Sequence, residues 1–304
     1  MTLEFRPEEG AVFDLSNRAK LRISGADRLR YLNGQISNDL RKAAPDRAIH
    51  ACVLSVKGKI NAEVFIVSEA DSFLLDTDPE MGEQLAARLE RYIIADDVQV
   101  ADVTEEFGLF HVVGADLALL PKGNIVAEAE RFGRRGVDLW IPRAEREGTL
   151  RELATRWPIC DEACAEAFRI EQGLPRWGRE LTDEIIPTEA NLEASAIDYA
   201  KGCYIGQEVI SRIKMSGQTN KRLCGFVAVT PIPLSAGMRL TNASGEAKEV
   251  GWLTSTTEST RLGRRLALGF LKRGFQEPGT RLEARGDGSS APAATVEIVP
   301  LPFR

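Results

Sequence analysis

The amino-acid sequence predicts an α+β fold with a second, smaller β-domain at the C-terminus. The first half of the chain mixes short strand patterns with short helix patterns and lacks the regular strand–helix alternation of a doubly wound sheet. From about Arg222 onward, short strand patterns separated by Pro and Gly replace helical periodicity. A length of 304 residues is enough for two or three domains. We therefore expect an α+β region over residues 1–220 and a β-domain over residues 221–304.

The elements of the α+β region follow from the spacing of its apolar residues. Alternation predicts strands, which we place at residues 11–24, 50–56, 60–67, 73–76, 98–103, 109–113, 125–130 and 137–141. Steps of three and four predict helices, which we place at residues 27–40, 78–92, 116–120, 149–156 and 161–172. Asp78 and Pro79 are typical of an N-cap and a first helical position. Leu29 and Tyr92 are expected to face the core from the first two helices.

The C-terminal region is predicted to consist of strands, forming a small barrel or sandwich. We place these strands at residues 223–229, 239–241, 249–255, 265–271, 282–284 and 294–299. Between the two regions, the stretch from Gly173 to Gly206 has no regular pattern. Ordered connections of this length are usually functional, so this stretch is the first place to search for a site.

The charge distribution does not favour nucleic acid as a direct partner. The net charge is −6 and is spread along the chain, whereas nucleic-acid binders usually carry a basic patch. Two short basic clusters, Arg131–Arg135 and Arg261–Arg265, are interpreted as solvated loops. The N-terminal residues lack the apolar segment of a signal peptide, and no run reaches the ~18 apolar residues of a membrane helix. We expect a soluble cytoplasmic protein without a membrane partner.

The cysteine content agrees with a reducing compartment. The five cysteines are odd in number and scattered, which argues against a disulfide framework. With two histidines, each in an apolar alternating run, the chain offers no pattern of a self-contained zinc site. Cys160 and Cys164 are four residues apart, and we interpret them as two small core-facing residues on one helical face.

The most unusual segment is KGCYIGQE at residues 201–208. Glycines on both sides of Cys203 let the backbone turn sharply and leave the thiol little covered. A helix is expected to begin at Gly206 or Gln207, so its N-terminus and Lys201 should both favour the thiolate. A thiolate can act as a nucleophile, a redox sensor or a soft metal ligand. The alternative from spacing alone is a buried cysteine in a glycine-rich turn.

This segment closely resembles the signature of the YgfZ family, folate-binding proteins related to the T-protein (aminomethyltransferase) of the glycine cleavage system. The resemblance extends over most of the chain, in the same order and spacing. It includes the segments Asp27–Leu29 with Gly34–Asp39, Arg169–Pro175 with Gly178 and Glu180, and Ile186–Leu192. The family implies a three-domain ring, in which two interleaved α+β domains and a C-terminal β-barrel surround a channel for tetrahydrofolate.

The resemblance also implies ligand contacts. Glu189 matches the T-protein carboxylate that accepts hydrogen bonds from the pterin ring, although an ordinary helix-start acid would look the same. Further candidates for folate contacts are Glu171, Arg169 and Tyr204, and for the glutamate tail of folate Lys201 and Arg212. Glu171 and Arg169 could equally form a salt-bridged scaffold, and Lys201 and Arg212 could pair with nearby acids.

One departure from T-protein concerns its catalytic chemistry. The T-protein Asp–Asp pair, one carboxylate of which aminomethyl transfer needs, is replaced here by Ala62-Glu63, and the aminomethyltransferases lack the cysteine of KGCYIGQE. Side chains alternate between the two faces of the strand predicted at residues 60–67, which places Glu63 on its polar face, opposite Ala62 and Val64. Loss of the pair and gain of Cys203 argue against glycine cleavage.

The resemblance implies a tetrahydrofolate-binding accessory factor for assembly or repair of iron–sulfur proteins, linked to oxidative stress and tRNA modification. Cys203 would be a transient cluster ligand, and because clusters take about four protein ligands, a partner chain must supply the others. The implied partners are an A-type iron–sulfur carrier protein and iron–sulfur client enzymes. One alternative is a folate-dependent one-carbon transferase or demethylase using Glu63 or Glu189. Another is a folate-binding scaffold in which the cysteine is incidental.

Overall fold

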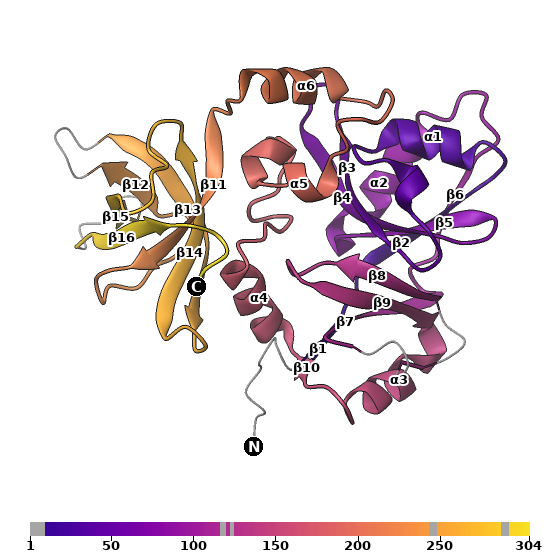
Figure 1. The fold of residues 1–304 in the computed structure, drawn as a ribbon, viewed down its shortest axis with the longest axis horizontal. Coiled ribbons are helices and arrows are strands. Elements are labelled where there is room, and N and C mark those ends of the chain that lie inside the picture. The colour runs from indigo at the N-terminus through magenta and orange to yellow at the C-terminus, as the bar shows by residue number, and fades with distance from the viewer. Residues whose placement is uncertain (1–9, 116–119, 122–124, 243–247, 287–291) are drawn as a thin grey trace. The chain divides into compact units, whose positions relative to one another are not determined.

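The chain folds into two compact units (Figure 1). The computed structural model describes residues 10–115, 120–121, 125–242, 248–286 and 292–304. Unit 1 comprises Met1–Cys164 and Glu193–Ser211, and unit 2 comprises Ala165–Leu192 and Arg212–Arg304. Mixed helices and sheets with a closed C-terminal barrel confirm the predicted α+β class. The helix predicted at residues 116–120 lies largely outside the described residues.

Two five-stranded sheets form unit 1. The first has the order β10-β1-β7-β9-β8, with β10 Ile159–Cys160, β1 Ala11–Asp14, β7 Phe107–Val113, β9 Arg135–Pro142 and β8 Ile125–Glu130. The second has the order β3-β4-β5-β2-β6, with β3 Ile49–Leu54, β4 Ile60–Ser68, β5 Ser72–Thr77, β2 Ala19–Ser24 and β6 Gln99–Asp102. The chain passes from the first sheet to the second between β1 and β2, and it returns to the first sheet between β6 and β7. The two sheets are therefore interleaved along the chain.

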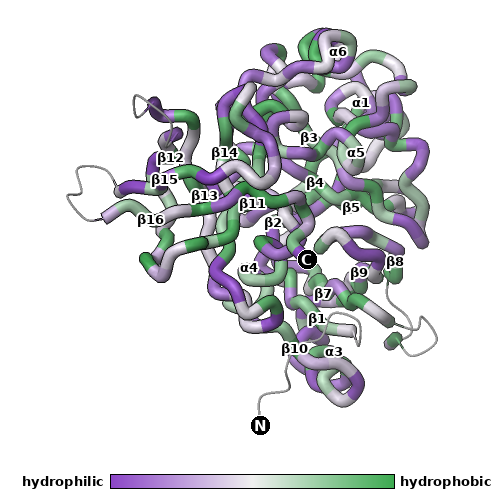
Figure 2. The backbone as a smooth tube through the Cα atoms, turned by 60° about the vertical axis from the view of Figure 1, so that its left-hand side comes forward, coloured by the Kyte–Doolittle hydropathy of each residue, from purple (hydrophilic) through white to green (hydrophobic). Residues whose placement is uncertain are grey.

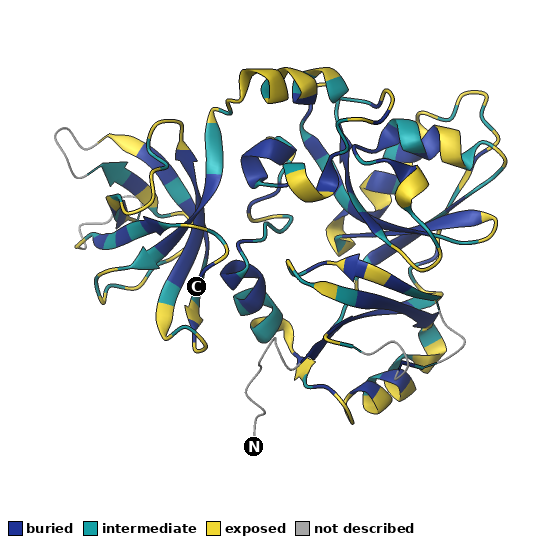
Figure 3. Ribbon diagram, in the orientation of Figure 1, coloured by how far each residue is buried: buried dark blue, intermediate teal, exposed yellow. Residues whose placement is uncertain are grey.

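The apolar faces of these sheets hold the core of unit 1. Helices α1 (Arg28–Gln35) and α2 (Gly82–Glu90) pack through Leu32, Leu85 and Leu89 on one face of the second sheet. The other face of this sheet meets the first sheet in a smaller cluster that includes Leu74 and Trp140. Helix α3 (Arg146–Leu153) lies with the cluster on the first sheet. Figures 2 and 3 show the hydrophobic and buried stretches along the central strands.

Both early helices are shorter than predicted. The first ends at Gln35 because Ile36 is extended and bridges to Val53 of β3, and a 3-10 helix at Leu40–Lys42 follows separately. Leu29, in the first turn of α1, is 43% exposed rather than part of the core, which corrects the prediction that it faces inward. Tyr92 lies beyond the end of α2 and is 37% exposed. Asp78 does cap, because it accepts a hydrogen bond from Glu80, but the element it caps is the 3-10 helix Pro79–Met81 that leads into α2.

The interpretation of Arg131 as part of a solvated loop is wrong. Its guanidinium is buried and donates hydrogen bonds to both carboxylate oxygens of Asp138, at 2.7–2.9 Å, and of Asp76. Arg18 also binds Asp76, and His111 Nδ1 lies 2.8 Å from Asp138. Burial alone would raise the pKa of Asp138, but Arg131 and His111 lower it to about 2. Unit 1 therefore contains a buried network of paired charges. The cluster of arginines in the sequence did not indicate this network.

A closed six-stranded barrel dominates unit 2. Its order is β11-β14-β13-β12-β15-β16, with β11 Lys221–Ala228, β14 Arg264–Lys272, β13 Glu249–Ser259, β12 Arg239–Asn242, β15 Arg281–Arg285 and β16 Ala294–Val299. All six predicted strands are confirmed, each within a few residues. The interior is filled by alternate apolar residues such as Phe226, Leu253 and Val296. A 3-10 helix, Pro187–Ala190, packs against β11.

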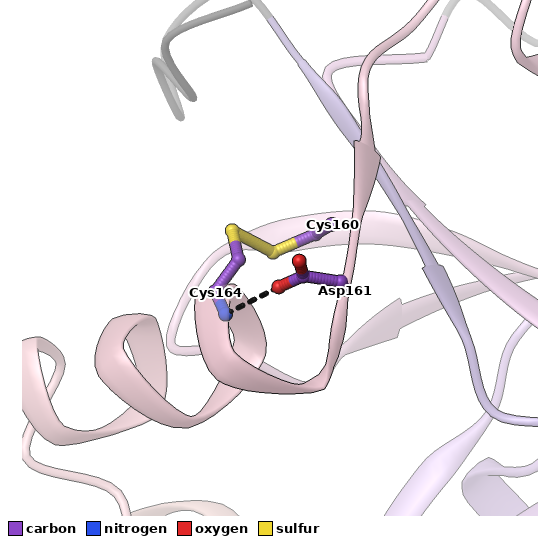
Figure 4. The surroundings of a disulfide bond; sticks show 3 residues. All are labelled: Cys160, Asp161 and Cys164. Atoms are coloured by element: carbon purple, nitrogen blue, oxygen red, sulfur yellow. Dashed lines mark hydrogen bonds between the residues drawn. A yellow bond between two sulfur atoms is a disulfide. The ribbon is translucent and has the colours of Figure 1, made fainter. Parts of the chain in front are cut away.

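Cys160 and Cys164 form a disulfide, which corrects the interpretation that they are two core-facing residues of one helix (Figure 4). Cys160 ends β10, whereas Cys164 lies in the first turn of α4 (Glu162–Glu171). The side chain of Asp161 accepts a hydrogen bond from the Cys164 backbone N–H at 2.8 Å. The chain turns between strand and helix, and this turn brings the two Cα atoms within 5.4 Å, inside the range for a disulfide.

No helix within the described ranges is both long and apolar enough to traverse a lipid bilayer.

The Arg131 network makes a prediction about stability. We expect Arg131→Met to lower the free energy of unfolding by about 3–5 kcal/mol, because it removes the guanidinium that binds both buried carboxylates and leaves only His111 beside Asp138 and Arg18 beside Asp76. In the wild type, the folded pKa of Asp138, about 2, lies below its ordinary value of 3.8, so its contribution is present above about pH 4 and is lost as the pH falls towards 2. Urea denaturation over this pH range measures both effects.

The matched control is Arg135→Met, a substitution of an exposed arginine from the same basic cluster. It is expected to change the free energy of unfolding by no more than about 0.5 kcal/mol. Equal effects of the two substitutions would contradict the buried network.

Candidate functional site

The signature segment is attached to unit 1 through Lys201. Its side chain is buried, and Nζ donates hydrogen bonds of 2.7 Å to the backbone oxygens of Asn33, Ile36 and Asn38. Burial lowers the pKa of Lys201 to about 8. Since an ammonium group has three donors, the three carbonyl oxygens use all of them. Lys201 therefore acts within the fold, and neither the thiolate of Cys203 nor the tail of folate needs to be its partner.

Cys203 is exposed on the loop that follows Lys201. The loop returns to the body of unit 1 through a hydrogen bond from Ile205 N to Gly34 O, at 3.2 Å. Gly206 has a φ of +86°, and a Cβ there would lie 2.6 Å from the backbone oxygen of Ser55. Helix α6 (Gln207–Ser216) begins directly afterwards, as predicted. The alternative of a buried cysteine is thus excluded, and the thiol is presented on a loop fixed at both ends.

Tyr204, a predicted folate contact, is buried beside the same lysine. Lys201 Nζ lies 5.0 Å from the centre of the Tyr204 ring. Burial raises the pKa of the Tyr204 phenol. The ring covers the ammonium from one side, which helps to explain how a charged group is tolerated there.

The segment Ile36–Asp39 joins this loop to helix α5 (Glu193–Ala196) and to β3. Ser37 Oγ donates a hydrogen bond to the Ala196 oxygen at 2.6 Å and accepts one from the Cys52 backbone N–H at 2.8 Å. Asn38 Nδ2 donates hydrogen bonds to the backbone oxygens of His50, at 2.8 Å, and Ser195, at 3.2 Å. One short turn therefore fixes α5 next to β3.

A second polar group lies between β3, β4 and α5, and sequence reasoning missed it as a group. His50 Nε2 lies 2.8 Å from Glu63 Oε1, and His50 Nδ1 lies 3.1 Å from Ser195 Oγ. Burial alone would raise the pKa of Glu63, but the contact with His50 and the positive charges of Arg18 and Arg131 lower it. Glu63 does face away from the apolar side of β4, as its alternation predicted.

Three predicted folate contacts of unit 2 form contacts within that unit. Glu189 is buried, with Oε2 accepting a hydrogen bond from Ile186 N at 3.2 Å and lying 3.6 Å from Lys221 Nζ. Arg169 donates to Glu166, Glu180, Ser255 and the Leu174 oxygen. Glu171 accepts hydrogen bonds from Ser259 and Arg261. For Arg169 and Glu171 these contacts match the salt-bridged scaffold that the sequence left open.

Arg212 lies on the exposed side of α6. In the part of the chain that the structure describes, no three or more His, Cys, Asp and Glu side chains gather into a group that could hold a metal ion. The described geometry thus offers an exposed thiol, a Ser–His–Glu contact chain and a buried carboxylate at Glu189.

Two family models match the chain. The GCVT N-terminal domain matches residues 6–120, and the glycine cleavage T-protein C-terminal barrel domain matches residues 221–303. The second match covers the closed barrel β11–β16. The crystal structure of glycine cleavage system aminomethyltransferase T from Bartonella henselae superposes with a TM-score of 0.84, covering 100% of this chain and 91% of that chain at 17% identity. This superposition shows a shared fold.

Curated relatives match over most of the chain at 24–27% identity. The "Iron-sulfur cluster assembly factor IBA57 homolog, mitochondrial" of Dictyostelium discoideum is 25% identical over 250 residues, which is 70% of this chain and 61% of that protein. The chain thus spans less than two thirds of that relative. The "tRNA-modifying protein YgfZ" of Shigella sonnei is 27% identical over 311 residues, covering 95% and 92% of the two chains. That of Aliivibrio fischeri strain MJ11 is 24% identical over 275 residues, covering 88% and 86%.

Substitution of the two glycines of the signature is expected to affect the stability of the fold differently. Gly206→Ala is expected to lower the free energy of unfolding by about 1–3 kcal/mol, because alanine is strained at positive φ and its Cβ would collide with the Ser55 oxygen. Gly202→Ala should be neutral, since a Cβ at that position meets no atom within 4 Å. Thermal and urea denaturation measure the difference, and equal stability of the two variants would contradict the docked loop.

Proposed function

We propose, from the premise that the chain belongs to the YgfZ family of proteins with glycine cleavage T-protein domains, that it is a tetrahydrofolate-binding accessory factor in assembly or repair of iron–sulfur proteins. The names of its relatives support this proposal, one being an iron–sulfur cluster assembly factor and others tRNA-modifying proteins. We place its action in the cytoplasm. Modification of tRNA would then depend on client enzymes rather than on direct contact with nucleic acid.

Cys203 is the residue through which the factor would act, and its exposure on a fixed loop is the observation that carries the proposal. Its thiolate would serve as a transient ligand of a cluster. Because a cluster takes about four protein ligands, the remaining ones would come from a partner chain, an A-type iron–sulfur carrier or a client enzyme. An exposed thiol on an ordered loop suits such sharing, since a partner reaches it without reordering the loop.

Glu189 is the residue proposed to bind the pterin of tetrahydrofolate. A carboxylate can accept adjacent N–H donors of a pterin ring, and Lys221 at 3.6 Å supplies a counter-charge for the buried group. Arg212, exposed on α6, is retained as a contact for the glutamate tail. We propose a scaffold role for Arg169, Glu171 and Lys201, which their contacts within the fold support.

A second function, a folate-dependent one-carbon transferase or demethylase, is favoured by one observation. Glu63 has a lowered pKa and contacts His50, so an ionised carboxylate stands next to a group able to transfer protons. This function predicts turnover of a methylated or aminomethyl amine and indifference to the loss of Cys203. The first function predicts dependence on Cys203.

Complementation distinguishes the two functions. In a bacterial strain that lacks its own YgfZ protein, the wild-type chain is expected to restore the activity of a [4Fe–4S] enzyme under oxidative stress. Cys203→Ala is expected to restore no more than an empty vector, because the partner-shared thiolate is lost. The readout is enzyme activity normalised to the level of the enzyme protein.

Gly202→Ala is the matched control, since it changes the neighbouring residue at a position with open space. It is expected to restore activity as the wild type does. Equal rescue by Cys203→Ala would remove the thiol from the mechanism and leave the folate site, beginning with Glu189, as the basis of function.

Folate binding tests Glu189 separately. Glu189→Gln is expected to weaken the binding of tetrahydrofolate about 10- to 100-fold, because a hydrogen bond to a charged group is replaced by one to a neutral group. Anaerobic isothermal titration calorimetry measures the dissociation constant. Asp183→Asn, at an exposed acid of the same stretch, should leave it unchanged. Unchanged affinity of Glu189→Gln, with an unchanged melting temperature, would remove Glu189 from the folate site.

A further inference from the structure

The contact chain formed by Ser195, His50 and Glu63 brings together a hydroxyl, an imidazole and a carboxylate, the three groups of an activated serine. The serine hydroxyl lies 3.1 Å from one imidazole nitrogen, and the carboxylate lies 2.8 Å from the other. This is the order of nucleophile, base and orienting group found in hydrolytic triads, with the two ring nitrogens exchanged. The three residues come from α5, β3 and β4, and all belong to unit 1.

The charges fix the roles of the two nitrogens. His50 Nε2 lies 2.8 Å from Glu63 Oε1 but makes no hydrogen bond in this structure, so Glu63 acts on the imidazole through its negative charge, and we assign the hydrogen of the neutral ring to Nε2, next to that charge. Nδ1 then holds the lone pair and accepts the hydroxyl proton of Ser195. When His50 takes up that proton, the Glu63 carboxylate stabilises the imidazolium.

The imidazole and the serine are held independently of their own polar contact. The His50 ring stacks on Phe65, with centroids 4.6 Å apart and planes within 6°, and the Arg131 guanidinium lies 4.0 Å from the centre of the same Phe65 ring. Asn38 fixes the backbone at both His50 and Ser195. Helix α5 is thus held by backbone contacts that need no serine hydroxyl. Ser195 itself is exposed, so a reagent can reach it.

We propose that Ser195 is a reactive nucleophile, with His50 as its general base and Glu63 as the residue that positions the base, and that it reacts with small carboxylic esters or thioesters. Ser195 Oγ forms a bond to the acyl carbon while its proton passes to His50 Nδ1. The leaving alkoxide or thiolate departs and takes this proton. Water then attacks the acyl carbon and gives a proton to His50; the bond from this carbon to Ser195 Oγ breaks, Oγ takes the proton back from His50, and the carboxylic acid leaves. No oxidant, metal or further co-reactant is needed.

The test uses the full-length protein and a fluorophosphonate probe, which reacts with activated serines. We expect the wild type to be labelled at Ser195, as identified by peptide mass spectrometry, and Ser195→Ala to be unlabelled there. His50→Gln is expected to react at least about 100-fold more slowly, because a general base contributes at least this factor. Glu63→Gln, which preserves shape, should also react more slowly. Ser211→Ala, at an exposed serine of α6, should be labelled as the wild type is.

A burst of p-nitrophenol from p-nitrophenyl acetate, absent in Ser195→Ala, would support the same assignment without the probe. Absence of labelling at Ser195 in the folded wild type, or equal rates for wild type, His50→Gln and Glu63→Gln, would overturn it. Where His50→Gln lowers the melting temperature, the isosteric Glu63→Gln decides the outcome. Neither readout involves folate or an iron–sulfur cluster, so this proposal stands or fails apart from the proposed function.

Discussion

The buried ammonium of Lys201 is the constraint on which the candidate site depends. A charge taken out of water is tolerated only where polar atoms replace its hydration, and three backbone oxygens from Asn33, Ile36 and Asn38 do so here. These oxygens become available because α1 ends at Gln35 and the next residues turn towards β3. The signature loop and this turn consequently form one structural unit, although more than 160 residues of sequence separate them.

The same turn also supports the contact between Ser195 and His50. Ser37 and Asn38 hold α5 beside β3 through backbone oxygens, which places Ser195 next to His50. The face of the second sheet that carries His50 and Glu63 also carries Asp76, which is paired with the buried Arg131. This sheet thus has an apolar face packed on α1 and α2 and a second face that mixes apolar residues with paired charges. Charge pairing on that face is what keeps Glu63 ionised.

The sequence predicted those features of the fold that depend on the spacing of nearby residues along the chain. The six barrel strands were predicted well because the period of two is imposed by the strand itself, whereas their pairing and register appear only in the structure. Helix ends were predicted less well, since Tyr92 obeys helical spacing but lies beyond the end of α2, and the helix predicted to reach Leu40 ends at Gln35. The loop around Cys203 was recognisable because glycines and a helix start lie close together along the chain.

Contacts between distant segments could not be predicted in this way. Arg131 resembles any surface arginine until Asp76 and Asp138 are brought around it by two different sheets. His50 and Ser195 are 145 residues apart, and no local pattern indicates their contact. The helical interpretation of Cys160 and Cys164 failed for a related reason, because a strand ends between them and a helix begins.

The division of roles within the signature follows from the chemistry of its side chains. A lysine ammonium can satisfy three acceptors at once, which makes it suited to fixing a loop against backbone oxygens. A thiol forms only weak hydrogen bonds and packs as a small apolar group when buried, as at Cys52 and Cys224, so only an exposed position such as that of Cys203 leaves it open to a partner. Ordering the loop in advance also lowers the entropy cost that a partner would otherwise meet on binding. A chain that must offer one thiol for shared ligation therefore gains from burying Lys201 and exposing Cys203 two residues later.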